Sequence, residues 1–219
     1  MKKSFLVGIF LVIFVVTPAQ AEETSSSSAM HPTMKMVREN IDHMIQTKRE
    51  EAMTHFQAKR EAFQEKLATL KDEQKKSLAE NIDTRLATIN KNRTDEMSRA
   101  LTRLQEYTDR LTTLAETAKS EGKNTTALDA ALQLVETDLE NAQDAITAQA
   151  GKEYIATVTT DAALRSAFST IVKQLKTDLL TTHKTLETAR EDLRKAVLEW
   201  EKIKTETTPS ASSSGQTNL

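Results

Sequence analysis

Apolar residues between Met34 and Lys119 recur every eleven residues, a spacing that equals three helical turns at 3.67 residues per turn. The recurring positions are Ile45, Phe56, Leu67, Leu78, Ile89, Ala100 and Leu111. A second track widens the stripe with Ile41, Phe63, Leu70, Ile82, Leu86, Met97, Leu101, Leu104 and Leu114. Because this period is close to the natural 3.6, the stripe winds little around the helix. The pattern predicts a long amphipathic helix over 34–119.

Helix-breaking residues are scarce along the whole chain. Between Pro32 and Pro209 there is no proline, and the only glycines are Gly122 and Gly151. Proline and glycine interrupt helices most strongly, so we expect breaks near these two glycines and helix elsewhere. Heptad-like apolar tracks predict two further helices, over 126–150 and 161–204.

Two segments leave alternatives open. Asn90 to Glu96 combines residues typical of a helix C-terminus with Thr94 and two acids, which suit a helix start. Either the long helix breaks or kinks there, or it continues. Residues 152–160 contain Tyr154, Ile155 and Val158 among threonines. We interpret this segment as a connecting loop whose apolar residues plug the end of a bundle, with a ligand-binding loop as the alternative.

The expected fold class is all-α, with coiled-coil character. A long amphipathic helix over 34–93 leads into an up-down-up three-helix bundle over 94–204, since short loops make neighbouring helices antiparallel. The first helix then has no internal partner of equal length. Its apolar stripe therefore predicts a surface for a protein partner or for self-association. The candidate partner-binding residues are Ile41, Ile45, Phe56 and Phe63.

Residues 1–21 are typical of a secretory signal peptide. Lys2 and Lys3 precede an apolar run from Phe5 to Val16, and Ala19-Gln-Ala21 supplies a cleavage site. The run is shorter than the roughly 20 residues of a membrane-spanning helix. An uncleaved signal anchor is the alternative. We expect export to the periplasm, the cell surface or the medium, with no transmembrane segment after cleavage.

Both ends of the mature chain are expected to be disordered, because neither the serine-rich lead over 22–33 nor the tail over 205–219 has enough apolar residues to fold. The chain has no cysteine, which excludes disulfides and cysteine–zinc sites. The formal net charge is −2, with mixed signs throughout, so no basic patch indicates nucleic-acid binding. No catalytic, cofactor-binding or metal-binding residues are predicted, because neither Glu-x-x-His nor His-Glu-x-x-His occurs.

Three short stretches suggest a resemblance. They are Glu65-Lys-Leu-Ala-Thr-Leu-Lys-Asp72, Ile89-Asn-Lys-Asn-Arg-Thr94 and Ser120-Glu-Gly-Lys-Asn-Thr125. With Leu101-Thr-Arg-Leu104, they resemble uncharacterised exported bacterial helical-bundle proteins that carry a signal peptide and a Lys-x-x-Gly helix hairpin. The resemblance spans about residues 60–200 and implies no activity and no site residue.

Together these observations predict a non-enzymatic, exported helical scaffold or adaptor that acts by protein–protein contact in the cell envelope. Two other functions stay open. One is a periplasmic holdase-type chaperone, because such proteins also carry long amphipathic helices. The other is a membrane-active helical protein.

Overall fold

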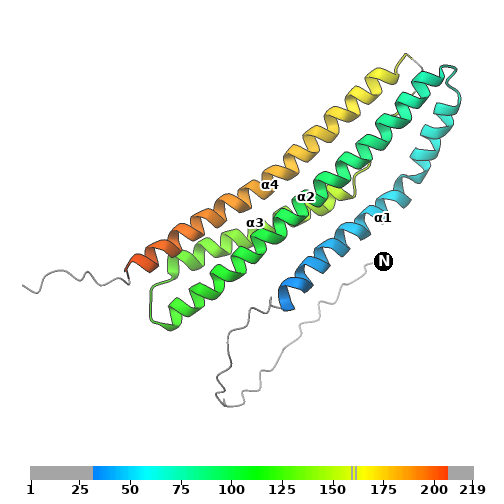
Figure 1. The fold of residues 1–219 in the computed structure, drawn as a ribbon. Helices are drawn as coiled ribbons and strands as arrows, with labels where there is room; N and C mark the ends of the chain where they lie inside the picture. The colour runs from blue at the N-terminus through cyan, green and yellow to red at the C-terminus, as the bar shows by residue number, and fades with distance from the viewer. Residues whose placement is uncertain (1–31, 159, 161, 207–219) are drawn as a thin grey trace, which may run out of the picture. The chain divides into compact units, whose positions relative to one another are not determined.

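Four α-helices make up most of the described chain. The computed structural model describes residues 32–158, 160 and 162–206. The helices are α1 (Pro32–Ala68), α2 (Glu73–Ser120), α3 (Thr126–Ala150) and α4 (Leu164–Glu206) (Figure 1). No strand occurs in these residues, and the helices pack against one another, so the all-α prediction is confirmed. The predicted signal peptide, most of the serine-rich lead and most of the tail lie outside the described residues.

The prediction of one long helix over 34–119 is wrong, because the chain turns at 69–72 and forms two helices, α1 and α2. The amides of Thr69 and Leu70 close the last turn of α1 on the carbonyls of Lys66 and Leu67. The Asp72 carboxylate then caps α2 by accepting hydrogen bonds from the amides of Gln74 and Lys75. The turn needs no glycine or proline, since Leu70 is buried and holds it against the core.

Of the two alternatives predicted for Asn90–Glu96, the helix break is wrong and the continuous helix is confirmed, because α2 runs through this segment. Asn90 and Thr94 are both buried on the inner face of the helix. The Thr94 hydroxyl donates to the Asn90 carbonyl one turn earlier, as helical threonines commonly do. These polar residues make tertiary contacts, and they do not end the helix.

The turn between α2 and α3 follows the predicted glycine. Gly122 has a φ of +79°, which favours glycine, and no atom lies near the position of its missing Cβ. Its amide donates to the Lys119 carbonyl, and the Lys123 amide donates to Ala118, which together form a Schellman motif. Thr125 is the N-cap residue of α3; its hydroxyl makes no hydrogen bond to a backbone amide of the helix and donates to the Asp129 carboxylate at 3.0 Å.

Helix α3 is much shorter than α2 and α4, and the chain continues beyond it without helix. Residues 152–158 have no regular secondary structure, and α4 begins only at Leu164. The predicted connecting segment buries Tyr154, Ala156 and Val158 in the core. Helices α2 and α4 run in the same direction, with α3 antiparallel to both (Figure 1).

The core divides into two clusters. Cluster 1 lies where α3 is present and includes Leu101 of α2, Ile146 of α3 and Ala189 of α4. Cluster 2 lies where residues 152–158 follow α3, and it includes Leu67 of α1 and Phe168 of α4. Helix α1 contributes to both clusters and packs against α2 and α3.

Candidate functional site: an apolar groove between α2 and α4

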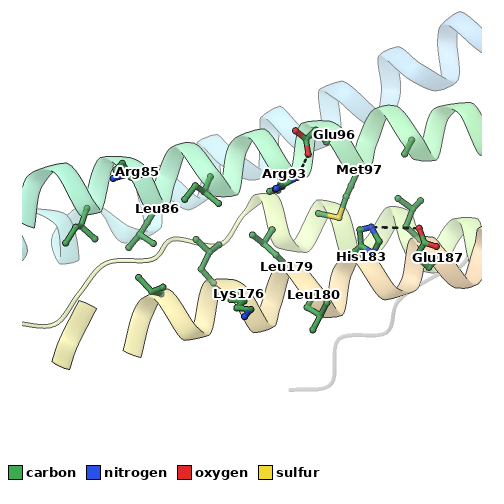
Figure 2. A pocket seen from close by; sticks show the side chains of 16 residues that line it. Arg85, Leu86, Arg93, Glu96, Met97, Lys176, Leu179, Leu180, His183 and Glu187 are labelled. Carbon is green, nitrogen blue, oxygen red and sulfur yellow. Dashed lines mark hydrogen bonds and ion pairs between the residues drawn. The ribbon is translucent and has the colours of Figure 1, made fainter. Parts of the chain in front are cut away.

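A groove of about 770 Å³ lies between α2 and α4. Ten of its sixteen lining residues are apolar. Leu86 and Met97 from α2 and Leu179 from α4 point into the space between the two helices (Figure 2). Charged side chains, among them Arg93 and Lys176, also line it. His183, Glu96 and Glu187 line it too, and both glutamates lie within ion-pair distance of an arginine. An apolar groove with a few polar groups is typical of a binding site.

A second cavity of about 520 Å³ continues the groove farther along the same two helices. Its lining includes Leu104 and Tyr107 from α2 and Leu193 and Leu198 from α4. Because α2 and α4 run in parallel, both helices present later residues at this end. The two cavities therefore form one apolar face, which we call the α2–α4 groove.

The α2–α4 groove gathers most of the large exposed apolar side chains of the described residues. Leu180 is 67% exposed, Leu198 is 62% exposed and Tyr107 is 59% exposed. The groove also includes the exposed residues Ile89, Leu114, Val172 and Val197. Scattered apolar residues are normal on a protein surface, whereas a contiguous exposed patch marks an interaction site.

Basic residues predominate among the charged groups that line the groove. They are Arg85, Arg93, Arg110, Lys176, Arg190 and Arg194, against the acids Glu96 and Glu187. Arg93 pairs with Glu96 at 2.8 Å, and a Glu187 carboxylate oxygen lies 3.8 Å from His183 Nε2 (Figure 2). The same oxygen lies 3.7 Å from the Arg190 guanidinium, which makes an ion pair with it. The acids are thus already partnered within the groove.

The predicted partner-binding stripe is not a free surface. Ile41 and Ile45 are buried in cluster 1, and Phe63 is buried in cluster 2. Only Phe56 is partly exposed, with the ammonium group of Lys59 5.1 Å from its ring centre. The prediction that these residues lack internal partners is wrong for three of the four. The physical reason is the turn at 69–72, which folds α1 back onto α2 and α3.

A buried polar layer lies between the two core clusters. The Asn90 amide donates to the carbonyls of Gln149 and Lys152, at 3.1 and 3.0 Å. The Gln149 amide donates in turn to Asn90 Oδ1 and to the Tyr154 hydroxyl. The Tyr154 hydroxyl donates to Asp178 of α4 at 2.8 Å. This chain of bonds ties α2, the end of α3 and α4 to the segment after Gly151.

Ion pairs extend the polar layer to α1. Arg49 donates to Asp95 at 2.6 Å and to the Thr94 hydroxyl at 2.7 Å. Arg60 bonds to Glu153 and lies 3.3 Å from Asp83. Burial alone would raise the pKa of Asp95, but the hydrogen bonds from Lys91 and Arg49 outweigh it and lower that pKa.

The other carboxylates of this layer shift in opposite directions. Burial raises the pKa of Asp83, and the Arg60 charge offsets only part of that effect. Burial also acts to raise the pKa of Asp178, but hydrogen bonds from Tyr154 and Lys152 outweigh it and lower that pKa. Burial raises the pKa of the Tyr154 phenol, and the neighbouring Asp178 adds to this shift. Apart from Gln149 Oε1, which is buried without a partner, the side chains of this layer hydrogen-bond to one another, so the polar layer joins the helices.

Sequence reasoning missed both the groove and the polar layer. The 11-residue recurrence included Leu78, Ile89 and Leu111, but it could not separate the groove side of α2 from its core side. A signal for the polar layer did exist, since Asn90, Thr94 and Asp95 interrupt an otherwise apolar stripe. That interruption left both a helix break and a continuous helix open, whereas in the structure it marks a site of tertiary hydrogen bonds within a continuous helix.

Within the described residues, no group of three or more acidic or histidine side chains is arranged to hold a metal ion. None of the four helices is both long enough and apolar enough to cross a bilayer. No protein family model matches the chain, no curated protein sequence is significantly similar to it, and no solved structure matches its fold.

Proposed function

We propose that this protein is a non-enzymatic helical scaffold or adaptor that acts by protein–protein contact through the α2–α4 groove. In this proposal, α2, α3 and α4 form a bundle onto which α1 folds, and export places the protein in the cell envelope. The observation that carries the proposal is the clustering of exposed Leu180, Leu198 and Tyr107 along one face of two parallel helices.

The energetic argument rests on the hydrophobic effect. Burying apolar surface contributes roughly 25 cal/mol per Å², so each exposed leucine covered by a partner contributes about 1 to 2 kcal/mol. A few such side chains at the centre of an interface commonly account for most of the binding energy. Seven of the twelve large apolar side chains that are exposed in the described residues line the groove.

The proposed function can be tested by site-specific photocrosslinking in the cells that produce the protein. A photoreactive residue replaces Leu180 in the groove, and a matched one replaces Leu134 on α3, which is 61% exposed and outside the groove. We expect a small set of discrete protein adducts at position 180 and none of these at position 134. Introducing Leu198→Glu into the Leu180 variant should remove the adducts.

Two results would contradict this function. Equal adducts at both positions would mean that the groove has no special role. A broad smear of unrelated exported proteins at position 180 would favour a holdase-type chaperone, which shields many unfolded chains in one apolar groove.

A further inference from the structure

The α2–α4 groove has a charge pattern that narrows the kind of partner it fits. We propose that its occupant is an amphipathic helix of another protein whose apolar stripe is flanked by acidic side chains. This inference rests on the proposed function and goes beyond it by naming the chemistry of the partner.

The geometry favours a helix as the occupant. Helices α2 and α4 already hold one helix between them, because α3 packs against both and buries Leu132, Leu139 and Ile146 in cluster 1. On the side of the open groove, the same two helices can accommodate another helix between them. From Ile82 to Leu114 its length along α2 is roughly 48 Å at 1.5 Å per residue. A shallow apolar groove of this length between two helices is the kind of site into which amphipathic helices bind.

The charges favour an acidic occupant. The lining holds six basic side chains against two acidic ones, whereas the whole chain has a net charge of −2. Among the described residues, Arg85, Lys176 and Arg194 form no ion pair, and Arg110 lies over the Tyr107 ring at 5.8 Å. Arg85 and Lys176 border one end of the groove, and Arg110 and Arg194 border the other.

The same charges disfavour a second copy of this chain as the occupant. If two grooves faced each other, in either relative direction, basic ends would meet basic ends. Like charges placed opposite one another weaken association. The charges of the groove therefore disfavour self-association and favour a partner of opposite charge.

The inference can be tested with two labelled synthetic helical peptides and the full mature chain. Both peptides carry leucines at alternating three- and four-residue spacing, and they differ only in glutamate or lysine beside the leucine stripe. Fluorescence anisotropy gives the two dissociation constants. We expect the glutamate peptide to bind about tenfold more tightly at low salt. This preference should shrink as salt is added, since exposed charges are screened.

Matched variants locate the effect. The double variant Arg85→Glu, Lys176→Glu should remove the preference for the glutamate peptide. The control Lys59→Glu, Lys71→Glu, which alters exposed lysines outside the groove, should retain it. Leu180→Glu should abolish binding of both peptides, and an unchanged circular dichroism spectrum would show that the variant is folded.

Several outcomes would overturn the inference. If both peptides bind equally and Leu180→Glu abolishes both, the groove binds helices without charge selection, and the proposed function stands alone. If neither peptide binds while the chain sediments as a dimer that Leu180→Glu dissociates, the occupant is a second copy. A third outcome is that neither peptide binds but the chain binds phosphatidylglycerol vesicles. If the Arg85→Glu, Lys176→Glu variant no longer binds these vesicles, the groove faces a membrane. Absence of all binding and of photocrosslinks at position 180 would overturn both proposals.

Discussion

The two halves of the core are built differently, although α1, α2 and α4 contribute to both. The buried residues of cluster 1 are aliphatic, and six of them are alanines, which come from α2, α3 and α4: Ala115, Ala118, Ala142, Ala150, Ala189 and Ala196. Cluster 2 has larger side chains, with Phe63, Tyr154 and Phe168 among its buried members. The rings of Phe63 and Phe168 meet edge to face, with centres 6.2 Å apart.

The difference follows from what lies beside α2 and α4 in each half. Where α3 is present, small residues let three helices approach closely, and helices satisfy their own backbone hydrogen bonds. Where residues 152–158 replace a helix, the backbone has no internal ladder, and side chains such as Asn90 must bind its carbonyls. A non-helical segment inside a helical protein thus requires both large apolar side chains and polar anchors.

The largest expected effect comes from cavities in the two clusters. Ile146→Ala in cluster 1 should lower the free energy of unfolding by about 3 kcal/mol, because Ile146 is fully buried. Leu67→Ala in cluster 2 should cost a similar amount, but it should increase hydrogen exchange mainly in α1 and residues 152–158. Helix α3 contributes no residue to cluster 2, which is the reason for this local response.

Urea unfolding and hydrogen-exchange mass spectrometry measure these two effects. Leu134→Ala, at an exposed position of α3, is the control and should change stability by less than about 0.5 kcal/mol. Equal increases of exchange in α3 for both core variants would show that the two halves unfold as one unit.

A smaller effect is expected from the polar layer. Asn90→Ala removes three hydrogen bonds and leaves the Lys152 carbonyl without its side-chain donor, at a cost of about 2 kcal/mol. Exchange should rise first in residues 152–158. Asn81→Ala, an exposed asparagine on the same helix, is the matched control. If Asn90→Ala were as stable as this control, the polar anchor would not be needed and the contrast between the halves would fail.

The smallest effect concerns the bond from Tyr154 to Asp178 and depends on pH. Tyr154→Phe should lower the free energy of unfolding by about 1 kcal/mol at pH 7, because it removes the hydrogen bond from the phenol to Asp178. The folded pKa of Asp178 is lowered, so its stabilising contribution is present above the unfolded pKa of about 3.9 and is lost as pH falls below it. The difference between wild type and Tyr154→Phe should therefore shrink between pH 5 and about pH 2.

Urea unfolding at several pH values measures this dependence. Tyr107→Phe changes an exposed tyrosine in the groove and should behave like wild type at every pH. If the stability difference between wild type and Tyr154→Phe stays constant with pH, the hydrogen bond from the Tyr154 phenol does not lower the pKa of Asp178.

The sequence by itself determined the helical content, the turn at Gly122 and the end of α3 at Gly151. These features depend on local chemistry. Gly122 adopts a positive φ at little cost, long runs without glycine or proline favour helix, and Gly151, with a φ of −82°, is a weak helix former that ends α3. The apolar residues of 152–160 likewise predicted a segment that is buried, as Tyr154 and Val158 are.

Only the tertiary structure decided where the long first helix turns and which apolar residues remain exposed. The turn at 69–72 depends on the burial of Leu70 and on the cap by Asp72, neither of which stands out in an 11-residue pattern. Once α1 folds back, its own residues Ile41, Ile45 and Phe63 become buried against the other helices. No described element covers Leu180 or Leu198. Periodicity shows that a helix has an apolar side, but the packing of its neighbours decides which part of that side meets the core.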